Sequence, residues 1–209
     1  MKFFLQLLFG LALCSQLSYA DNMREGFSAY ESRDYVNAAQ FFQAACESGN
    51  MEACYDLANM YDQGQGVVRD DPKAVELFTK SCDGGFADGC YNLGLMSYRG
   101  EGTKQDYTKA FVLFSKSCDA DHIRGCYNLG IMHYTAQGVQ KDYAKAANLF
   151  QKTCDQGYEE GCLTLGVMYR EGQSVLQNKQ TALDLFKKAC DGNIPDGCKN
   201  YEKLRREMP

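Results

Sequence analysis

The chain has 209 residues, of which 45% are apolar, so wholesale disorder is excluded and the chain can form one sizeable core or one elongated array. The formal net charge is −5, from 27 acidic and 22 basic side chains, so no overall positive field exists to neutralise the phosphates of a nucleic acid. The 11 cysteines are odd in number, which leaves at least one thiol outside any set of disulfides.

The first 20 residues have the pattern of a cleaved export signal. Lys2 precedes an almost continuous apolar run over residues 3–13, and Ala20 is a small residue of the kind that signal peptidase requires. The apolar run is about half the roughly 20 residues that a membrane span needs. Cleavage after Ala20 would leave ten cysteines and export the protein to the periplasm or the extracellular space. The alternative, a lipidated Cys14, is disfavoured because the preceding Leu13 is bulky.

The remaining cysteines recur with a period of 36 residues, which is typical of stacked repeats. They form five C-x7-C pairs: Cys46 and Cys54, Cys82 and Cys90, Cys118 and Cys126, Cys154 and Cys162, Cys190 and Cys198. An alanine and a phenylalanine keep the same register, at Ala38, Ala74, Ala110, Ala146 and Ala182, and at Phe42, Phe78, Phe114, Phe150 and Phe186. We therefore predict a leading capping helix over 21–33 and five repeats, at 34–69, 70–105, 106–141, 142–177 and 178–209.

Each repeat is predicted to be a pair of antiparallel helices, giving an all-α chain with eleven helices. An aspartate or asparagine can cap the first helix, and apolar or small residues follow it at offsets 4, 7, 8 and 11, within an arc of about 100°. The second helix is predicted to follow the second cysteine. A small residue recurs in it, at Ala58, Gly94, Gly130 and Gly166, and would let another backbone approach closely. Gly-x-Gly segments at 64–66 and 100–102 end this helix.

The cysteine pairs fit one disulfide per repeat. Residues eight apart in a continuous helix have Cα atoms roughly 12 Å apart, beyond the limit of about 7 Å for a disulfide, so a bridged segment must double back. Gly49, Gly85 and Gly157 lie inside these segments and permit such a turn. Metal binding is the alternative, but each pair offers two thiols where zinc needs four ligands, and His122 and His133 are the only histidines. We predict disulfides within each C-x7-C pair, no metal and no cofactor.

The repeated residues resemble a known family. The alanine and phenylalanine of the first helix, the Tyr-Asn-Leu-Gly-x-Met of the second and the 36-residue period resemble Sel1-like repeats, relatives of the tetratricopeptide repeat. The C-x7-C in every repeat narrows the resemblance to the secreted Helicobacter cysteine-rich proteins. Leu163 and Thr164 depart from Tyr-Asn, and Ala136 replaces a turn glycine. The resemblance implies a right-handed αα-superhelix, or solenoid, of disulfide-clamped hairpins with a concave groove.

The same resemblance implies two functions of different classes: penicillin binding with slow β-lactamase activity, and contact with host cells. A serine β-lactamase needs Ser-x-x-Lys with Ser-Asp-Asn and Lys-Thr-Gly elsewhere, and none of these strings occurs. Ser115 and Lys116 are adjacent and therefore point in different directions on a helix. His122 and His133 cannot form a catalytic metal site alone and are interpreted as ordinary surface or half-buried residues. No catalytic residue is identified, and enzymatic activity stays open.

Lysines repeat at two positions of the first helix and could form a basic strip. They are Lys73, Lys109 and Lys145 at offset 3, and Lys80, Lys116, Lys152 and Lys188 at offset 10. The two positions lie about 20° apart around the helix, at the edge of the apolar stripe. On an acidic protein such a strip suits the carboxylates of a peptide or a β-lactam. The alternative is a solvated flank whose lysine stems cover apolar surface.

A second polar row follows the second helices, at Asn92, Asn128 and Asn200, with Asp56 and Thr164 in register. Amides in a groove can hold the backbone of an extended ligand, whereas hydrogen bonding between helices is the alternative. We predict a monomeric, exported scaffold that binds peptide-like, peptidoglycan-like or other carboxylate ligands, or a host protein, but neither nucleic acid nor, after signal cleavage, a membrane. The candidate ligand-binding residues are Lys73, Lys109, Lys145, Asn92 and Asn128. The alternative function is a penicillin-binding protein with slow β-lactamase activity.

Overall fold

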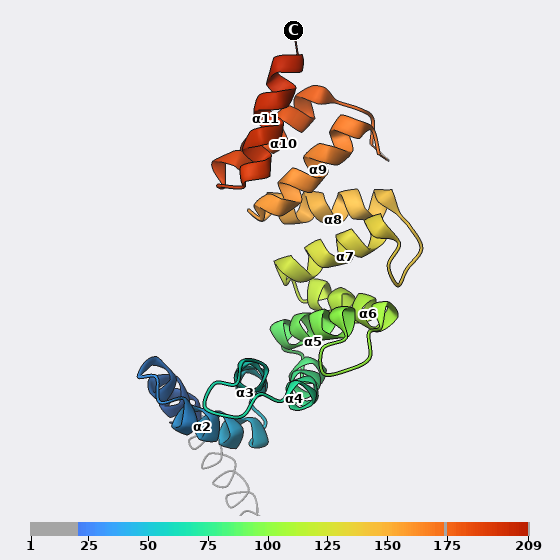
Figure 1. Cartoon of the computed structure of the whole chain (residues 1–209). Coiled ribbons are helices and arrows are strands. Elements are labelled where there is room, and N and C mark those ends of the chain that lie inside the picture. The colour runs from blue at the N-terminus through green and yellow to red at the C-terminus, as the bar shows by residue number, and fades with distance from the viewer. Residues whose placement is uncertain (1–20, 174, 209) are drawn as a thin grey trace, which may run out of the picture. The chain divides into compact units, whose positions relative to one another are not determined.

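The computed structural model describes residues 21–173 and 175–208, and within these ranges all regular secondary structure is helical. A leading helix, residues 21–31, precedes ten further helices (Figure 1). The ten are α2 (Tyr35–Glu47), α3 (Met51–Gln63), α4 (Asp71–Asp83), α5 (Ala87–Arg99), α6 (Tyr107–Asp119), α7 (Ile123–Thr135), α8 (Tyr143–Asp155), α9 (Glu159–Glu171), α10 (Lys179–Asp191) and α11 (Pro195–Glu207). The predicted all-α class is confirmed. The predicted export signal, with Cys14, lies outside the described residues.

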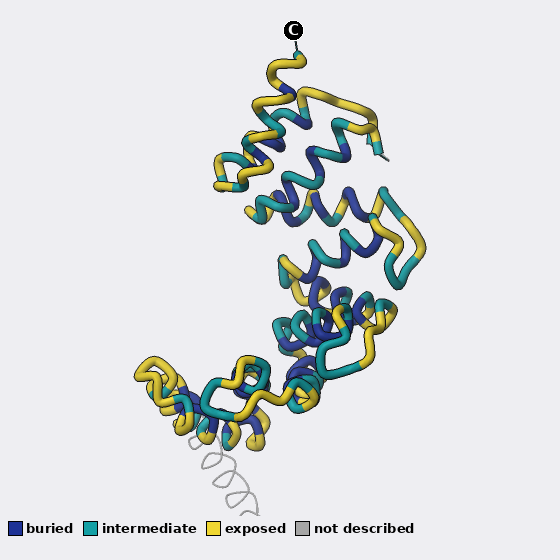
Figure 2. Tube along the Cα trace, in the orientation of Figure 1, coloured by how far each residue is buried: buried dark blue, intermediate teal, exposed yellow. Residues whose placement is uncertain are grey.

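The chain divides into two compact units, residues 1–105 and 106–209. The first unit contains the leading helix and α2–α5, and the second contains α6–α11. Within each unit, consecutive helices pack against each other. Figure 2 shows the buried residues along the helix faces that meet neighbouring helices, while the exposed residues gather in the loops and on the outer turns. Each unit is therefore a stack of helices with a core that runs along the stack, as in repeat proteins.

The predicted caps begin the first helices of the repeats. The Asp70 carboxylate accepts a hydrogen bond from the backbone N–H of Lys73 at 2.9 Å, and Asp142 accepts one from the backbone of Lys145 at the same distance. Such a bond satisfies one of the N–H groups that a helix start leaves unpaired. Four of the second helices, α3, α5, α7 and α9, end on a left-handed residue, for example Gly64 at φ 67°. The sequence pattern therefore sets both ends of the hairpins.

All five predicted disulfides are present. The bridges are Cys46–Cys54, Cys82–Cys90, Cys118–Cys126, Cys154–Cys162 and Cys190–Cys198, with Cα–Cα distances of 4.4–4.6 Å. The chain doubles back through one residue with positive φ in each pair, at Gly49, Gly85, Asp121, Gly157 and Asn193. Aspartate and asparagine tolerate this conformation better than other side chains do. Each bridge thus clamps the end of a first helix to the start of the next helix.

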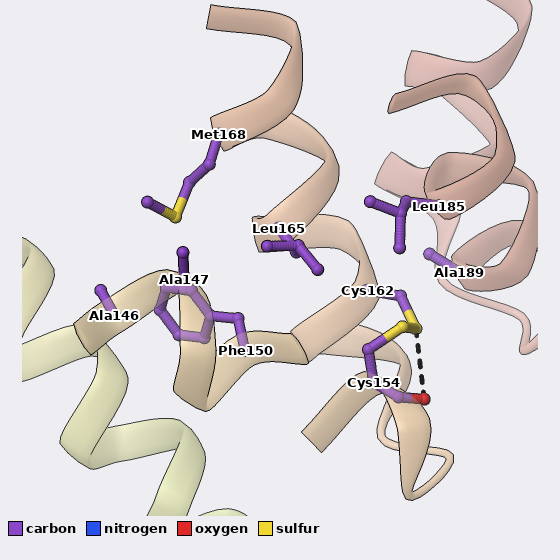
Figure 3. Packing of buried hydrophobic residues seen from close by; sticks show 9 residues of the cluster. All are labelled: Ala146, Ala147, Phe150, Cys154, Cys162, Leu165, Met168, Leu185 and Ala189. Atoms are coloured by element: carbon purple, nitrogen blue, oxygen red, sulfur yellow. Dashed lines mark hydrogen bonds between the residues drawn. A yellow bond between two sulfur atoms is a disulfide. The ribbon is translucent and has the colours of Figure 1, made fainter. Parts of the chain in front are cut away.

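The repeated phenylalanine is the centre of each core layer, and a small residue on an adjacent second helix makes room for it. Phe150 and Phe186 are fully buried, and a Cβ atom added to Gly130 or Gly166 would lie 2.7 Å from the respective ring. Figure 3 shows Phe150 in one cluster with Leu165 and the α8–α9 disulfide. The small residues therefore make room for a phenylalanine ring of the neighbouring first helix, where the sequence led us to expect a close backbone.

The leading helix packs in the same way as a second helix. A Cβ atom on Gly26 would lie 2.6 Å from the ring of Phe42 on α2, so Gly26 stands where Gly130 stands relative to Phe150. The ring of Phe27 meets the ring of Phe42 edge-on, with centroids 5.3 Å apart. The leading helix is therefore part of the first unit's core and positions its own exposed side chains beside α3.

Candidate functional site

Two of the three lysines at offset 3 have an acidic neighbour within or just before their own helix. Lys73 Nζ donates to Glu76 at 2.8 Å, and this hydrogen bond raises the pKa of Lys73. Lys145 Nζ lies 3.6 Å from Asp142, and Lys109 is exposed. Exposed ion pairs of this kind contribute only about 0–1 kcal/mol, so they compete weakly with a ligand carboxylate. The predicted carboxylate-binding role of these three lysines stays a prediction.

The lysines at offset 10 join neighbouring repeats. In the first unit, Lys80 Nζ on α4 donates to the carbonyl oxygen of Cys46 at the end of α2, at 2.8 Å. In the second unit, Lys152 on α8 donates to Asp121, just beyond α6, at 2.8 Å, and this bond lowers the pKa of Asp121. A cation near a helix C-terminus also interacts favourably with the helix dipole. Lys80 and Lys152 therefore connect their repeats to the preceding one, a role that the repeat pattern alone did not predict.

The polar row on the second helices is partly used between helices. In the first unit, Asn92 Nδ2 on α5 donates to Asn59 Oδ1 on α3 at 3.1 Å. In the second unit, Arg170 on α9 donates to Asn200 Oδ1 on α11 at 3.3 Å. Asn128 on α7 is half-buried, and within the described residues its amide has no hydrogen-bond partner. The row thus includes amides that are bonded between helices, at Asn92 and Asn200, while the ligand-binding role of Asn92 and Asn128 stays a prediction.

A pocket of about 310 Å³ lies in the first unit, between the leading helix and α3. Phe27 and Tyr30 of the leading helix form one wall, and they are 41% and 37% exposed. The floor is Phe42 and Met60, both buried. The Tyr30 hydroxyl donates to Gln65 Oε1 at 3.0 Å and so connects the leading helix to the turn after α3.

The opposite wall of this pocket is polar and comes from α3, with Tyr55, Asp56 and Asn59. Burial, followed by the negative charges of Glu52 and Asp88, raises the pKa of Asp56 to about 7. Its Oδ2 atom is shielded from solvent and has no hydrogen-bond partner in the described part of the chain. Burial also raises the pKa of Tyr55. Leaving a buried carboxylate oxygen unpaired is costly, which makes this wall a candidate site.

From the sequence, Asp56 is predicted only as a member of the asparagine row. The available signal was an acid at a position where the other repeats have Asn92, Asn128, Thr164 and Asn200. The two histidines have structural environments. His122 Nδ1 accepts the backbone N–H of Gly125 at 3.0 Å and caps α7, whereas the ring of His133 is buried against Phe111. Among the described residues, no group of three or more His, Cys, Asp or Glu side chains could hold a metal ion.

Stacked antiparallel helices of equal length, joined by a disulfide in every repeat, define an α-helical repeat protein. The model of the Sel1 repeat matches the chain five times, at residues 15–50, 52–86, 87–122, 123–158 and 160–194. The chain therefore belongs to the Sel1 repeat family. These units are shifted by about half a period from the predicted boundaries, because a periodic array can be divided before either helix. In the family's register, four of the disulfides join one unit to the next, and Cys190–Cys198 joins the last matched unit to α11.

Solved structures give the same picture. The protective antigen c5321 of uropathogenic Escherichia coli, described as having an SLR fold, is 28% identical to this chain, with a TM-score of 0.86. The match covers 91% of this chain but only 42% of that protein. A Sel1 repeat protein from Oxalobacter formigenes is 25% identical with a TM-score of 0.81, covering 87% of this chain and 74% of that one.

The cysteine-rich protein B of Helicobacter pylori is 32% identical with a TM-score of 0.50, over 63% of this chain and 94% of that one. This similarity agrees with the resemblance carried by the C-x7-C pairs, while membership of the Helicobacter group stays a prediction. No curated protein matches the chain. None of the described helices is long and apolar enough to cross a membrane.

Proposed function

We propose that this Sel1 repeat protein is an exported, monomeric scaffold that binds a peptide-like segment of a partner along its second helices. The observation that carries the proposal is Asn128, a half-buried amide that has no partner in the described part of the chain and stands in a row of polar side chains at the same repeat position. An amide offers both a donor and an acceptor, which is what the backbone of an extended peptide requires.

The disulfides support both the compartment and the binding mode. Five bridges in one chain fit an oxidising environment such as the periplasm or the extracellular space. They also hold the helices in place before a ligand arrives. A rigid surface loses less conformational entropy on binding than a flexible one, so its contacts contribute more fully to affinity.

The exposed lysines at offset 3 extend the proposal to carboxylates. Lys109 and Lys145 stand at the third position of α6 and α8, on the first helices of the second unit. A peptide carboxylate, or the carboxylate of a cell-wall fragment, would form a charge-assisted hydrogen bond with either ammonium group. The wider ligand class is therefore peptide-like or cell-wall-related carboxylate compounds.

The test is a selection from a random peptide library displayed on phage, against the oxidised, exported protein. We expect enriched sequences whose synthetic peptides bind about tenfold more weakly to the double variant Lys109→Ala, Asn128→Ala, as the loss of one or two hydrogen bonds predicts. Asn148→Ala, which removes an exposed amide from α8, is the matched control and should leave binding unchanged. The proposal fails if no sequence is enriched or if the double variant binds as the wild type does.

The alternative, slow β-lactam hydrolysis, rests on the family resemblance alone. Nitrocefin turnover by the same oxidised protein discriminates between the two functions. We expect no turnover above that of the reduced, unfolded chain. Turnover that survives purification and refolding with the disulfides intact would overturn the preference for a binding scaffold.

A further inference from the structure

The pocket of the first unit has a chemistry that the rest of the polar row lacks. Its α3 wall carries a carboxylate, Asp56, and its other wall carries aromatic rings. The residues in register with Asp56 are neutral, and those in register with Asn59 are Leu95, Ile131 and Val167 in the inner repeats and Lys203 in the last. Asn59 accepts a hydrogen bond from Asn92 of α5, so its amide has a partner within the unit. The buried Oδ2 atom of Asp56 has no such partner among the described residues, and Asp56 is therefore the residue that indicates a ligand preference.

The charge in this pocket is unbalanced. The two charged groups that act on Asp56 are Glu52 on the same helix and Asp88 on α5, and both are negative. Arg24 of the leading helix does not line the pocket, and its guanidinium lies 3.3 Å from both Asp21 and Glu25. The pocket therefore has a negative potential that its own unit does not neutralise, and a cation would supply the missing partner.

The aromatic wall is preorganised. The Phe27 ring is held edge-on by Phe42, and the Tyr30 ring is held edge-on by Tyr35 with centroids 5.2 Å apart. On the α3 side, the Tyr55 ring lies 5.3 Å from the ring of Phe86. The faces of aromatic rings attract cations, and the attraction grows when the cation is removed from water. The methylene groups of a long basic side chain would also pack against these rings.

We propose that this pocket binds one lysine or arginine side chain of the partner polypeptide, with Asp56 as its counter-ion and Phe27 and Tyr30 as its aromatic wall. This inference rests on the proposed function, because it assigns a subsite to the same peptide-binding scaffold. The pocket volume of about 310 Å³ lies at the lower end of the range for small-molecule sites, roughly 300–1,000 Å³, and suits one long side chain better than a large cofactor.

The first experiment uses peptides from the selection described above. We expect a lysine or arginine to be enriched at one position. Replacing it with norleucine, which removes the charge and keeps most of the chain, should weaken binding at least about tenfold, as expected for a charge-assisted hydrogen bond in a desolvated site. With Asp56→Asn, which introduces the residue found in three other repeats, the lysine and norleucine peptides should bind equally.

Asp62→Asn is the matched control. It makes the same change of charge on the same helix at a half-buried residue that does not line the pocket, so it should preserve the preference for lysine. Enriched peptides without a basic residue, or a preference that survives Asp56→Asn, would overturn the subsite and leave the scaffold function standing. Lysine amide that binds as tightly as the whole peptide would mean a small amine ligand and would also overturn it. A selection with no enriched peptide overturns the scaffold function itself.

A second readout is the pH dependence of binding. The groups that face Asp56 are Glu52 and Tyr55 on α3 and Asp88 on α5, with Tyr30 across the pocket. Because the pKa of Asp56 is raised to about 7, its protonation should weaken lysine binding about tenfold between pH 8 and pH 6. Asp56→Asn should bind with no such slope. A bound lysine peptide should lower the pKa of Asp56 in a carboxyl ¹³C NMR titration, and an unchanged pKa would contradict a direct ion pair.

Discussion

In the first unit, α3 has Asp56 in the wall of a pocket, whereas in the second unit α7 has Asn128 at the same repeat position. The two units share the phenylalanine core, the caps and the disulfides, so this difference cannot come from the fold. It shows that the core positions of the repeat set the architecture, while the half-buried positions on the second helices are free to differ. Function in such a protein is expected at the half-buried positions.

Truncating the core phenylalanine should destabilise the two units by different amounts, because the pocket lies in the first unit. Phe150 is enclosed by its cluster, whereas Phe42 borders the pocket on one side. We expect Phe150→Ala to lower the free energy of unfolding by about 3–5 kcal/mol and Phe42→Ala to cost about 1 kcal/mol less, because part of the space around Phe42 is already open. Urea unfolding of the oxidised protein, with amide hydrogen exchange to assign the loss to a unit, measures both. Equal losses would contradict the asymmetry.

The charge at Asp56 should lower the stability of the first unit at neutral pH. Its pKa is raised from 3.8 to about 7 in the folded chain, so the folded state holds the proton more tightly than the unfolded state. The resulting stability is full below pH 3.8 and is lost as the pH rises toward about 7. Asp56→Asn should therefore raise the free energy of unfolding at pH 8 by about 1–2 kcal/mol, and by much less at pH 4. A thermal melt at the two pH values tests this, and a destabilised variant at pH 8 would refute it.

The second unit should respond to pH in the opposite sense, through His133. Its ring is 6% exposed and Nδ1 has no hydrogen-bond partner among the described residues. Burial, followed by the charge of Lys145, lowers the pKa of His133 below 6.5. The neutral ring's contribution is therefore full above pH 6.5 and is lost as the pH falls through the lowered value.

His133→Gln should remove this loss of stability between pH 7.5 and pH 5.5, even though it weakens the packing against Phe111 at both values. Amide exchange of α7 at the two pH values is the measurement. A variant that keeps the full acid-side loss would assign that loss to another group.

Much of the architecture was predictable because the residues that determine it occur at the same position in several repeats. Capping aspartates such as Asp70, the buried phenylalanines and the cysteine pairs recur at a fixed period, so the register alone gave the helices and the disulfides. The position of the leading helix in the repeat pattern was less predictable, because it does not follow the 36-residue period. Gly26 precedes Ala58 by 32 residues instead of 36, because the connection before α2 has three residues (32–34) where the one before α4 has seven (64–70).

The candidate pocket was not predictable because its defining property is the absence of a partner. The sequence shows that Asp56 is an acid among neutral polar residues, but it does not show that the charges which act on its carboxylate in the described part of the chain are the negative ones of Glu52 and Asp88. Likewise, Lys80 and Lys152 belong to a periodic row, yet their bonds to the preceding repeat depend on how one hairpin stacks on the next. The repeat period predicts where a side chain lies on its helix, but its hydrogen-bond partner depends on how the helices pack.

The smallest predicted difference between the units is at the end of the second helices. Gly64 and Gly100 end α3 and α5 at φ 67° and 77°, whereas Ala136 ends α7 in the same left-handed conformation at φ 62°. A residue with a side chain is destabilised by about 1–2 kcal/mol in this left-handed conformation. Replacing it with glycine removes this strain, but glycine also increases the conformational entropy of the unfolded chain, which offsets part of the gain in stability. Ala136→Gly should therefore stabilise the second unit by about 0.5 kcal/mol.

The reverse exchange in the first unit is the matched control. Gly64→Ala should destabilise by more than Ala136→Gly stabilises, because the new Cβ atom would also lie 3.3 Å from Cβ of Arg69. Urea midpoints for the two variants and the wild type measure both effects. A loss of stability in Ala136→Gly would mean that the methyl group makes a contact worth more than the strain it imposes, and the turn of the second unit would then differ from that of the first in packing as well as in residue.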